Sequence, residues 1–203
     1  MKILLGTHNH DKVKEIRAIM AMVSGIEVIS IDDLAITVPD VVEDRDTIEG
    51  NAIKKASEIA DLTGLPTLAD DTGLFVRAMN WNPGVYAARY AGENCSYQDN
   101  RLKMLEEMKL LNDRYAEFRT VVAFCEPEKQ IGTAKGVVVG SITREEFGEQ
   151  GFGYDAIFRA EESGLTFGEM GGNEKHTISH RGRAFRAILP LLQTWLQKKT
   201  QES

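Results

Sequence analysis

The chain has 203 residues, of which 42% are apolar and 27% are charged, so it is long enough for one globular domain with a sizeable core. Its formal net charge of −7 disfavours nucleic-acid binding, which generally needs a broad basic surface. No run of residues is apolar enough for a membrane span or a signal peptide, so we expect a cytoplasmic protein without membrane partners. Cys95 and Cys125 lie far apart without metal-binding spacing, which predicts two free, partly buried thiols.

Predicted strands and helices alternate in the first part of the chain, and strands later follow one another directly. In chain order we expect a strand at 2–6, a helix at 11–23, a strand at 27–31, a helix at 47–62, a short strand at 66–69, a helix at 96–108 capped by Ser96, paired strands at 119–125 and 133–143, a short strand at 156–158 and a helix at 183–197 that contains Pro190. Residues 198–203 are expected to form a flexible tail. This order predicts a single α/β domain over residues 1–203, in which helices flank a mixed, twisted sheet.

Polar residues follow the first predicted strand, where the chain turns into the first helix. Such a turn presents backbone N–H groups and the positive end of the helix dipole, which together attract anions. Thr7 and Asn9 could add hydrogen bonds to a phosphate, and Lys12 could add a positive charge. The alternative is that Asn9 or Asp11 only caps the helix. The GxxxxGKS/T pattern of a P-loop is absent from the chain.

Two acidic pairs are candidates for a metal site. Asp70 and Asp71 come directly after an apolar predicted strand, and Glu43 begins a second pair ahead of the second helix. A hard divalent cation prefers oxygen ligands of this kind, and two adjacent carboxylates can titrate as a coupled pair. The alternatives are a solvated turn and ordinary acidic residues near a helix start. Lys55 shares a helix side with Asn51, four residues earlier, and could point toward the same site.

Two later segments could bind a flat nucleobase. In Gly151-Phe152-Gly153-Tyr154-Asp155, glycines beside an aromatic residue let the backbone approach a ligand, and the aromatic ring could stack on the base. The alternative is a glycine turn around a core aromatic residue. The segment Lys175-His176-Thr177-Ile178-Ser179-His180-Arg181-Gly182 offers several donors, which a 6-oxo purine needs at O6 and N7. A nucleophilic Ser179–His180 pair is disfavoured, because adjacent residues seldom form such a pair.

Taken together, the order and spacing of these segments resemble the inosine triphosphate pyrophosphatase family, from Lys2 to about Leu196. The matching stretches are T-x-N-x-x-K at Thr7–Lys12, Asn51-Ala52 with Lys55, Ala69-Asp70-Asp71-Thr72-Gly73-Leu74, Pro83-Gly84-Val85-Tyr86-Ala87-Ala88-Arg89-Tyr90-Ala91-Gly92, Phe152-Gly153-Tyr154-Asp155 and Ile178-Ser179-His180-Arg181-Gly182. The resemblance implies a mixed α/β fold with two lobes around a central substrate cleft, a homodimer, and Mg²⁺ as cofactor. It also implies hydrolysis of ITP, dITP or XTP by water attack at the α-phosphorus, which yields the monophosphate and pyrophosphate.

The resemblance further implies roles for particular residues. Phosphate binding would fall to Thr7, His8, Asn9, Lys12 and Lys55. Asp71 would be the general base and a metal ligand, with Glu43 as the second ligand. Substrate contacts are implied for Asp70, Thr72, Phe152, Gly153, Tyr154, Asp155, Lys175, His180 and Arg181. Among these, Phe152 would stack on the base, and Lys175, His180 and Arg181 would read its edge.

The sequence departs from the family pattern at three single positions and in the Gly171-Gly172-Asn173-Glu174 stretch before Lys175, and none of these departures removes a proposed catalytic group. His8 stands where glycine is common, Gly50 where glutamate is common, and Ala156 where proline is common. Two other functions are compatible with the sequence: a pyrophosphatase for another class of modified nucleotide, and a catalytically silent nucleotide-binding sensor. The sequence alone does not decide how GTP is excluded, or whether Asp70 or Asp71 handles the proton of the attacking water.

Overall fold

The computed structural model describes residues 1–21 and 23–202. Close contacts divide the chain into two compact units, each assembled from separate segments of the sequence. The first unit comprises Met1–Asp71, Thr120–Gly136 and Arg181–Ser203, and the second comprises Thr72–Arg119 and Val137–His180. None of the described helices is both long and apolar enough to cross a membrane.

Seven strands form one mixed sheet, and β3, β5 and β6 each contribute residues to both units. The strands are β1 (Lys2–Leu5), β2 (Glu27–Ser30), β3 (Thr67–Val76), β4 (Pro83–Gly84), β5 (Tyr115–Glu126), β6 (Lys129–Ile142) and β7 (Phe158–Ala160). Their order is β2-β1-β3-β5-β6-β7, and β4 pairs with β3. β1 is parallel to β2 and β3, whereas β4 is antiparallel to β3 and β7 is antiparallel to β6. The predicted mixed α/β class is therefore confirmed.

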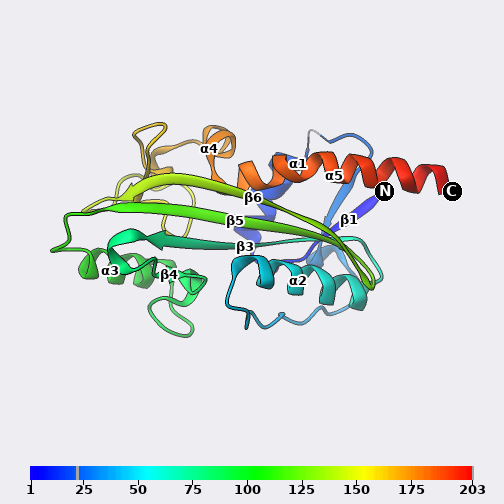
Figure 1. Cartoon of the computed structure of the whole chain (residues 1–203), viewed down its shortest axis with the longest axis horizontal. Helices are drawn as coiled ribbons and strands as arrows, with labels where there is room; N and C mark the ends of the chain where they lie inside the picture. The colour runs from blue at the N-terminus through cyan, green and yellow to red at the C-terminus, as the bar shows by residue number, and fades with distance from the viewer. Residues whose placement is uncertain (22, 203) are drawn as a thin grey trace. The chain divides into compact units, whose positions relative to one another are not determined.

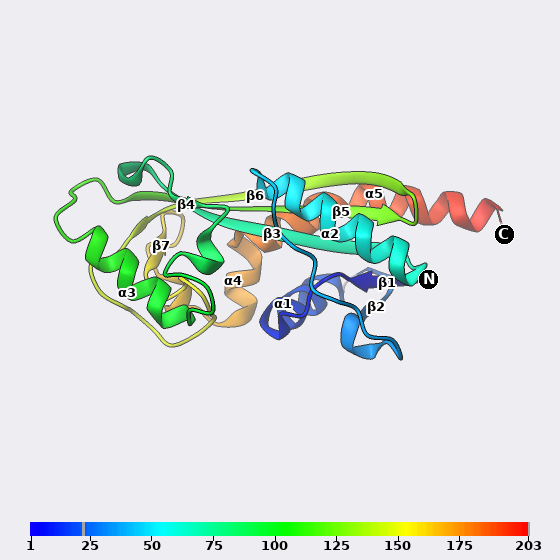
Figure 2. The same cartoon turned by 90° about the horizontal axis from the view of Figure 1, so that it is seen from below.

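Within the first unit, helices cover both faces of the sheet (Figure 1 and Figure 2). The helices are α1 (His10–Met20), α2 (Ile48–Thr63) and α5 (His180–Glu202). Side chains of β1 alternate between the faces, so Ile3 and Leu5 pack with α1 and α5 whereas Leu4 packs with Ile59 of α2. Each fully buried side chain of this kind contributes roughly 1.5–3 kcal/mol to folding.

Local signals explain where two of the helices begin or end. Thr47 caps α2, because its Oγ1 accepts a hydrogen bond from the backbone N of Gly50 at 3.0 Å. Gly64 ends the same helix with a φ of 69°, a conformation that glycine adopts without strain. Ser96 caps α3 (Tyr97–Glu107), as the sequence predicts. These helix starts and ends follow from the local sequence.

The second unit has a core of its own. It gathers apolar side chains from β3, α3, β5, β6, β7 and the loops between them, including Leu74, Met104, Phe118, Phe158 and Phe167. Its further elements are α4 (Gly172–Ile178) and the 3₁₀ turns Arg77–Met79, Ala87–Arg89 and Phe167–Glu169, while a fourth 3₁₀ turn, Ile31–Asp33, belongs to the first unit. Both cysteines are free, with Cys95 half-buried and Cys125 buried, as predicted.

The predicted ends of β3 and of the last helix are wrong. β3 continues to Val76, so Asp70 and Asp71 lie inside the strand and not in a turn after it. Acidic residues followed by glycine are typical of a turn. In this chain the strand can continue through Asp70 and Asp71, because Lys12, Arg181 and Lys55 from neighbouring helices lie beside their carboxylates. α5 continues through Pro190 to Glu202, beyond its predicted end at residue 197, and Ser203 lies outside the described residues. Lys199 Nζ lies 2.8 Å from Glu126 Oε1, which fixes this last part of the helix to β5.

Candidate active site

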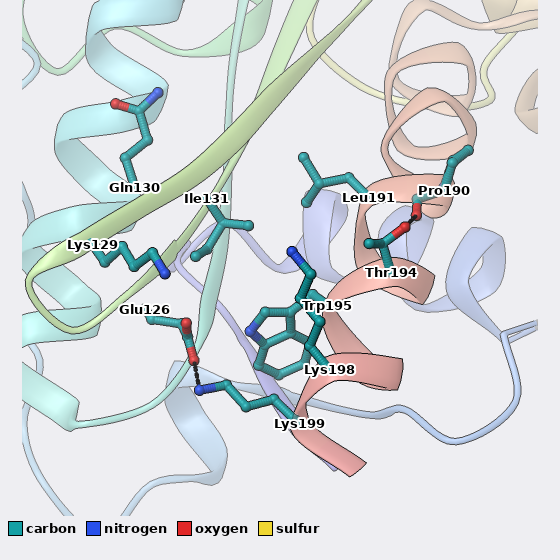
Figure 3. Close-up of a pocket in the computed structure, with 10 residues that line it drawn as sticks. All are labelled: Glu126, Lys129, Gln130, Ile131, Pro190, Leu191, Thr194, Trp195, Lys198 and Lys199. Atoms are coloured by element: carbon teal, nitrogen blue, oxygen red, sulfur yellow. Dashed lines mark hydrogen bonds and ion pairs between the residues drawn. The ribbon is translucent and has the colours of Figure 1, made fainter. Parts of the chain in front are cut away.

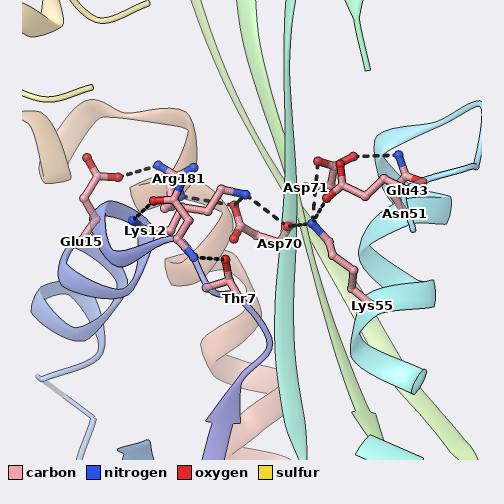
Figure 4. A network of polar contacts seen from close by, with 10 residues as sticks. Thr7, Lys12, Glu15, Glu43, Asn51, Lys55, Asp70, Asp71 and Arg181 are labelled. Atoms are coloured by element: carbon pink, nitrogen blue, oxygen red, sulfur yellow. Dashed lines mark hydrogen bonds and ion pairs between the residues drawn. The ribbon is translucent and has the colours of Figure 1, made fainter. Parts of the chain in front are cut away.

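The carboxylates of Asp70 and Asp71 leave β3 on opposite faces of the sheet (Figure 4). Successive side chains of a strand alternate in this way. Asp70 meets Lys12 of α1 and Arg181 of α5, whereas Asp71 meets Asn51 of α2. The two carboxylates therefore contact different helices, although both lie near Lys12 and Lys55.

The Asp70 carboxylate lies in a buried network of charges. Its Oδ2 is 3.3 Å from Arg181 Nε and 3.4 Å from Lys12 Nζ. Arg181 Nη1 donates to Glu15 Oε2 at 2.5 Å, and only 2% of Arg181 is exposed. Although burial opposes it, Lys12 and Arg181 hold the pKa of Asp70 well below its usual range. Asp70 is thus a poor proton acceptor, and the described contacts of Arg181 are with Glu15 and Asp70.

The Asp71 carboxylate lies in a different network on the α2 side. Asn51 Nδ2 donates to Asp71 Oδ2 at 3.0 Å, and Asn51 Oδ1 accepts from the backbone N of Arg45 at 2.9 Å. Lys55 Nζ lies 2.6 Å from Glu43 Oε1 and 3.9 Å from Asp71 Oδ1. Burial raises the pKa of Asp71, and Glu43 adds to the rise while Lys55 opposes it. Asp71 therefore accepts a proton more readily than an exposed aspartate.

Two lysines from opposite faces of the sheet reach the same backbone carbonyl. Lys55 Nζ donates to the carbonyl oxygen of Asp70 at 2.7 Å, and Lys12 Nζ reaches it at 3.5 Å. Burial lowers the pKa of Lys12, against the attraction of the Asp70 carboxylate. Burial also opposes the charge of Lys55, but the Asp71 and Glu43 carboxylates outweigh it and raise the pKa of Lys55. The ammonium groups of Lys12 and Lys55 therefore lie on opposite sides of β3, both near Asp70.

The turn before α1 is a capped helix start. Asn9 Oδ1 accepts from the backbone N of Lys12 at 3.1 Å, and the backbone N of Asn9 donates to Thr7 Oγ1 at 3.2 Å. His8 Nε2 lies 3.7 Å from Asp40 Oδ1. Asn9 therefore caps α1. This cap is compatible with anion binding, because a capped helix keeps the positive end of its dipole.

The predicted base-binding loop belongs to the second unit, and Asp155 holds it together. Asp155 Oδ2 accepts hydrogen bonds from the backbone N of Phe152 at 2.7 Å and from Lys175 Nζ at 2.6 Å. Gly151 and Gly153 have positive φ values of 74° and 62°, and a Cβ on Gly151 would lie 2.0 Å from Asp155 Oδ2. Lys175 Nζ also lies 5.0 Å from the centre of the Phe152 ring. The loop thus brings an aromatic face and a cation together.

Other predicted substrate residues of the second unit have internal contacts. Tyr154 is 5% exposed, and its hydroxyl donates to the carbonyl oxygen of Ala87 at 2.8 Å. The ring of His180 stacks on Phe118 with a centroid distance of 4.4 Å. Thr72 is half-buried and follows Asp71 along β3. Tyr154 and His180 therefore help to pack the second unit.

The described residues contain no group of three or more His, Cys, Asp and Glu side chains placed to hold a metal ion. A separate pocket of about 550 Å³ lies between α5 and the β5–β6 hairpin (Figure 3). It is lined by residues such as Ile131 and Trp195 and by three lysines, and it contains none of the predicted site residues. Glu43 and Asp71, the predicted metal ligands, both lie near Lys55 Nζ, at 2.6 Å and 3.9 Å.

The chain matches the model of the Ham1 family over residues 3–191. It belongs to that family. This Ham1 family chain is 42% identical over 189 residues to the dITP/XTP pyrophosphatase of Geobacter sulfurreducens, covering 92% of this chain and 94% of that protein. It is 40% identical over 193 residues to the dITP/XTP pyrophosphatase of Flavobacterium johnsoniae, covering 95% and 98%.

Solved structures agree with this membership. The Ham1 family chain resembles a HAM1 protein from Coxiella burnetii with a TM-score of 0.85 and 37% identity, covering 96% of this chain and 99% of that one. It resembles the Staphylococcus aureus Ham1 protein with a TM-score of 0.81 and 36% identity, covering 98% and 100%. The family resemblance that the sequence motifs indicate is confirmed.

Sequence reasoning missed two residues of this site in the Ham1 family chain. Glu15 was not expected to contact Arg181, although an acidic residue three positions after Lys12 on the buried side of α1 is a detectable signal. Asn51 belonged to a motif but had no role, and only the fold shows that it joins Asp71 to the backbone of Arg45. Both contacts are long-range, which explains why local patterns did not predict them.

Proposed function

We propose that this chain hydrolyses noncanonical purine nucleoside triphosphates, such as ITP, dITP and XTP, to the monophosphate and pyrophosphate. The observation that carries the proposal is the arrangement of Lys12 and Lys55 around the Asp70 carbonyl, beside the Asp71 and Glu43 carboxylates. Cations suited to a polyphosphate lie next to a carboxylate suited to activating water. The printed names of two similar proteins, dITP/XTP pyrophosphatase, support the substrate class.

The lysines would bind the phosphate chain. A triphosphate carries about four negative charges, which repel a nucleophile unless they are offset. Lys12 and Lys55 supply two positive charges, and the backbone around Thr7, His8 and Asn9 supplies N–H donors at the start of α1. When the phosphates arrive, they would compete with the Glu43 carboxylate for the ammonium of Lys55.

Asp71, and not Asp70, is the proposed general base. Without a bound cation, burial and Glu43 raise the pKa of Asp71; a cation held by Asp71 and Glu43 would lower it again and keep the carboxylate in the ionised form that a base needs. The hydrogen bond from Asn51 to Oδ2 fixes the carboxylate, so that Oδ1 can accept the proton of the attacking water. Asp70 is a weaker base, because Lys12 and Arg181 hold its pKa well below the usual range. Its proposed role is to hold Lys12 in place.

Mg²⁺ is the proposed cofactor, and the residues present fit it. Mg²⁺ takes oxygen ligands, often from one or two carboxylates together with substrate phosphates. The Asp71 and Glu43 carboxylates repel each other, as the raised pKa of Asp71 indicates, and a divalent cation held by both would relieve that repulsion. When bound, Mg²⁺ would offset negative charge on the phosphate oxygens.

The second unit would bind the base. Phe152 offers an aromatic face, Gly153 allows a close approach, and Lys175 offers a donor for O6 of an oxo-purine. Adenine has an amino group at that position, so it would leave the donor unpaired. Such mismatches can discriminate by about 10⁴-fold in well-built sites. Asp155 would support the base contact indirectly, by holding Phe152 and Lys175.

Arg181 receives a different role from the one that the family resemblance implies. Its guanidinium contacts Glu15 and Asp70 within the first unit. We assign it to positioning Asp70, and through Asp70 the phosphate-binding Lys12. The resemblance alone supports two further proposals, that the protein is a homodimer and that it works in the cytoplasm. Light scattering after size-exclusion chromatography would measure the oligomeric state.

A panel of nucleoside triphosphates tests the proposed function. We expect pyrophosphate release from ITP, dITP and XTP that is much faster than from ATP or GTP, and that stops when EDTA removes the metal. Release of orthophosphate as the first product would mean attack at the γ-phosphorus and would overturn the mechanism. Tight binding of ITP without any turnover would instead identify a nucleotide sensor, and preference for modified pyrimidines would reject the substrate class.

A further inference from the structure

A second site in this chain is a cavity of about 340 Å³ in the second unit, lined by Arg114, Arg144 and Arg159. The other lining residues are Ser141, Ile142, Thr143, Glu145 and Phe147. None of them takes part in the proposed reaction. Three guanidinium charges against the one carboxylate of Glu145 leave the lining with an excess of two positive charges.

The charge of Arg114 is not offset by an ion pair within residues 1–21 and 23–202. Its Nε donates to the carbonyl oxygen of Ile142 at 2.7 Å, its Nη1 to that of Met108 at 2.7 Å, and its Nη2 to that of Thr143. Carbonyl groups satisfy the N–H donors but leave the net charge in place. Burial lowers the pKa of Arg114, and the neighbouring Arg144 lowers it further. The two guanidinium groups therefore repel each other in the absence of an anion.

Arg159 contributes a hydrogen-bond donor without a partner. It lies directly opposite Ser141 in the antiparallel pairing of β6 and β7, so the two side chains share one face of the sheet. Its guanidinium lies 5.2 Å from the centre of the Phe147 ring. Its Nε is buried and has no hydrogen-bond partner among the described residues. A buried donor in this state is unfavourable.

We propose that this cavity, the arginine pocket, binds a small phosphate-type oxyanion, either inorganic phosphate or pyrophosphate. Guanidinium groups match phosphate oxygens with paired N–H donors, which makes arginine the usual residue for such ligands. The excess of two positive charges suits a multiply charged anion, and the volume suits a compact one. The site does not depend on the proposed function, although pyrophosphate is also the proposed product of that reaction.

Arginine labelling with phenylglyoxal, read residue by residue by mass spectrometry, tests the pocket in the intact protein. We expect phosphate or pyrophosphate to slow the labelling of Arg144 and Arg159 at least about fivefold relative to potassium chloride of equal ionic strength. Arg77, which is more than half exposed and pairs with Asp113 outside the pocket, is the control and should label equally in all salts. Equal slowing at Arg77, or none at Arg159, would overturn the proposal. Slowing by only one of the two anions identifies the ligand.

Two further experiments separate the pocket from the proposed catalytic cluster. Phosphate or pyrophosphate should still protect Arg159 from phenylglyoxal in the Lys55→Met variant, because Lys55 belongs to the proposed catalytic cluster. If the variant loses this protection, the anion acts from the catalytic cluster, and the proposed pocket is rejected. In equilibrium dialysis, Arg159→Gln should weaken phosphate binding at the pocket at least about tenfold, whereas Arg77→Gln should not. Arg144→Gln, at an exposed side chain, gives the same test if Arg159→Gln does not fold. Unchanged binding in folded variants of both pocket arginines would exclude the site.

Discussion

Asp70 Oδ2 accepts from Arg181 Nε at 3.3 Å on one face of β3, while its neighbour Asp71 is held by Asn51 on the opposite face. Two adjacent carboxylates with the same covalent chemistry therefore differ in their electrostatics. Cations hold the pKa of Asp70 below its usual range, whereas burial raises that of Asp71. This separation predicts that one substitution removes catalysis and the other removes stability.

For Asp71, substitution by asparagine should lower kcat for ITP by at least about 100-fold, the scale expected for loss of a positioned base. The side chain keeps its shape and can still contact Asn51, so the free energy of unfolding should change little. Pyrophosphate release at saturating ITP and urea denaturation of the same preparation measure the two effects. Near-normal turnover by folded Asp71→Asn protein would reject the assigned role.

For Asp70, the same substitution should act mainly on stability. It leaves Lys12 and Arg181 buried without the carboxylate that they share, and losing one partner of a buried ion pair typically costs about 3–5 kcal/mol. Asp113→Asn is the matched control, because it breaks an exposed pair with Arg77 that water screens, and it should destabilise the fold much less. If urea denaturation gives equal losses for the two variants, the buried network does not stabilise the fold as described.

The sequence predicted elements that depend on local patterns and missed contacts that depend on the fold. The cap at Ser96 and the apolar side of α2 could be predicted, because residues within a few positions determine both. The continuation of β3 through Asp70 could not, because charged residues are stable there only beside Lys12 and Arg181, which lie far away in the sequence. Family motifs identified the residues of the site, but they gave no information about which carboxylate faces which helix.

The role of Arg181 can be tested by comparing it with Lys175. Because the described contacts of Arg181 are with Glu15 and Asp70, Arg181→Lys should lower the free energy of unfolding and leave the ITP/ATP ratio of kcat/KM unchanged. Lys175→Met should lower that ratio, since it removes the proposed donor to O6. Steady-state kinetics with both nucleotides measure the ratio. A fall for Arg181→Lys with no fall for Lys175→Met would restore Arg181 as the residue that reads the base.

The two cysteine thiols should react with iodoacetamide at different rates in the native protein at pH 8. Burial raises the pKa of Cys125 from its ordinary value of 9.0 to about 11. At pH 8 the thiolate fraction of Cys125 is therefore about 100-fold smaller than that of an exposed cysteine, since each pKa unit is a factor of ten. Iodoacetamide should modify half-buried Cys95 first, and both residues only in urea. Rapid labelling of Cys125 in the native protein at pH 8 would contradict this burial.

The Phe152 ring should contribute to substrate affinity and not to the chemical step. Its loop is held by Asp155, which binds the Phe152 backbone and Lys175, so removal of the ring leaves that scaffold intact. Stacking on a base is worth about 1–3 kcal/mol by alanine substitution, so Phe152→Ala should raise KM for ITP about 5- to 150-fold. Since the reacting phosphorus lies at the other end of the nucleotide, kcat should stay near its original value, and Phe152→Tyr should restore KM. Steady-state kinetics with ITP give KM and kcat for the unsubstituted protein, Phe152→Ala and Phe152→Tyr. A fall in kcat at constant KM would mean that Phe152 contributes to the chemical step. No change in either constant would mean that the base binds elsewhere.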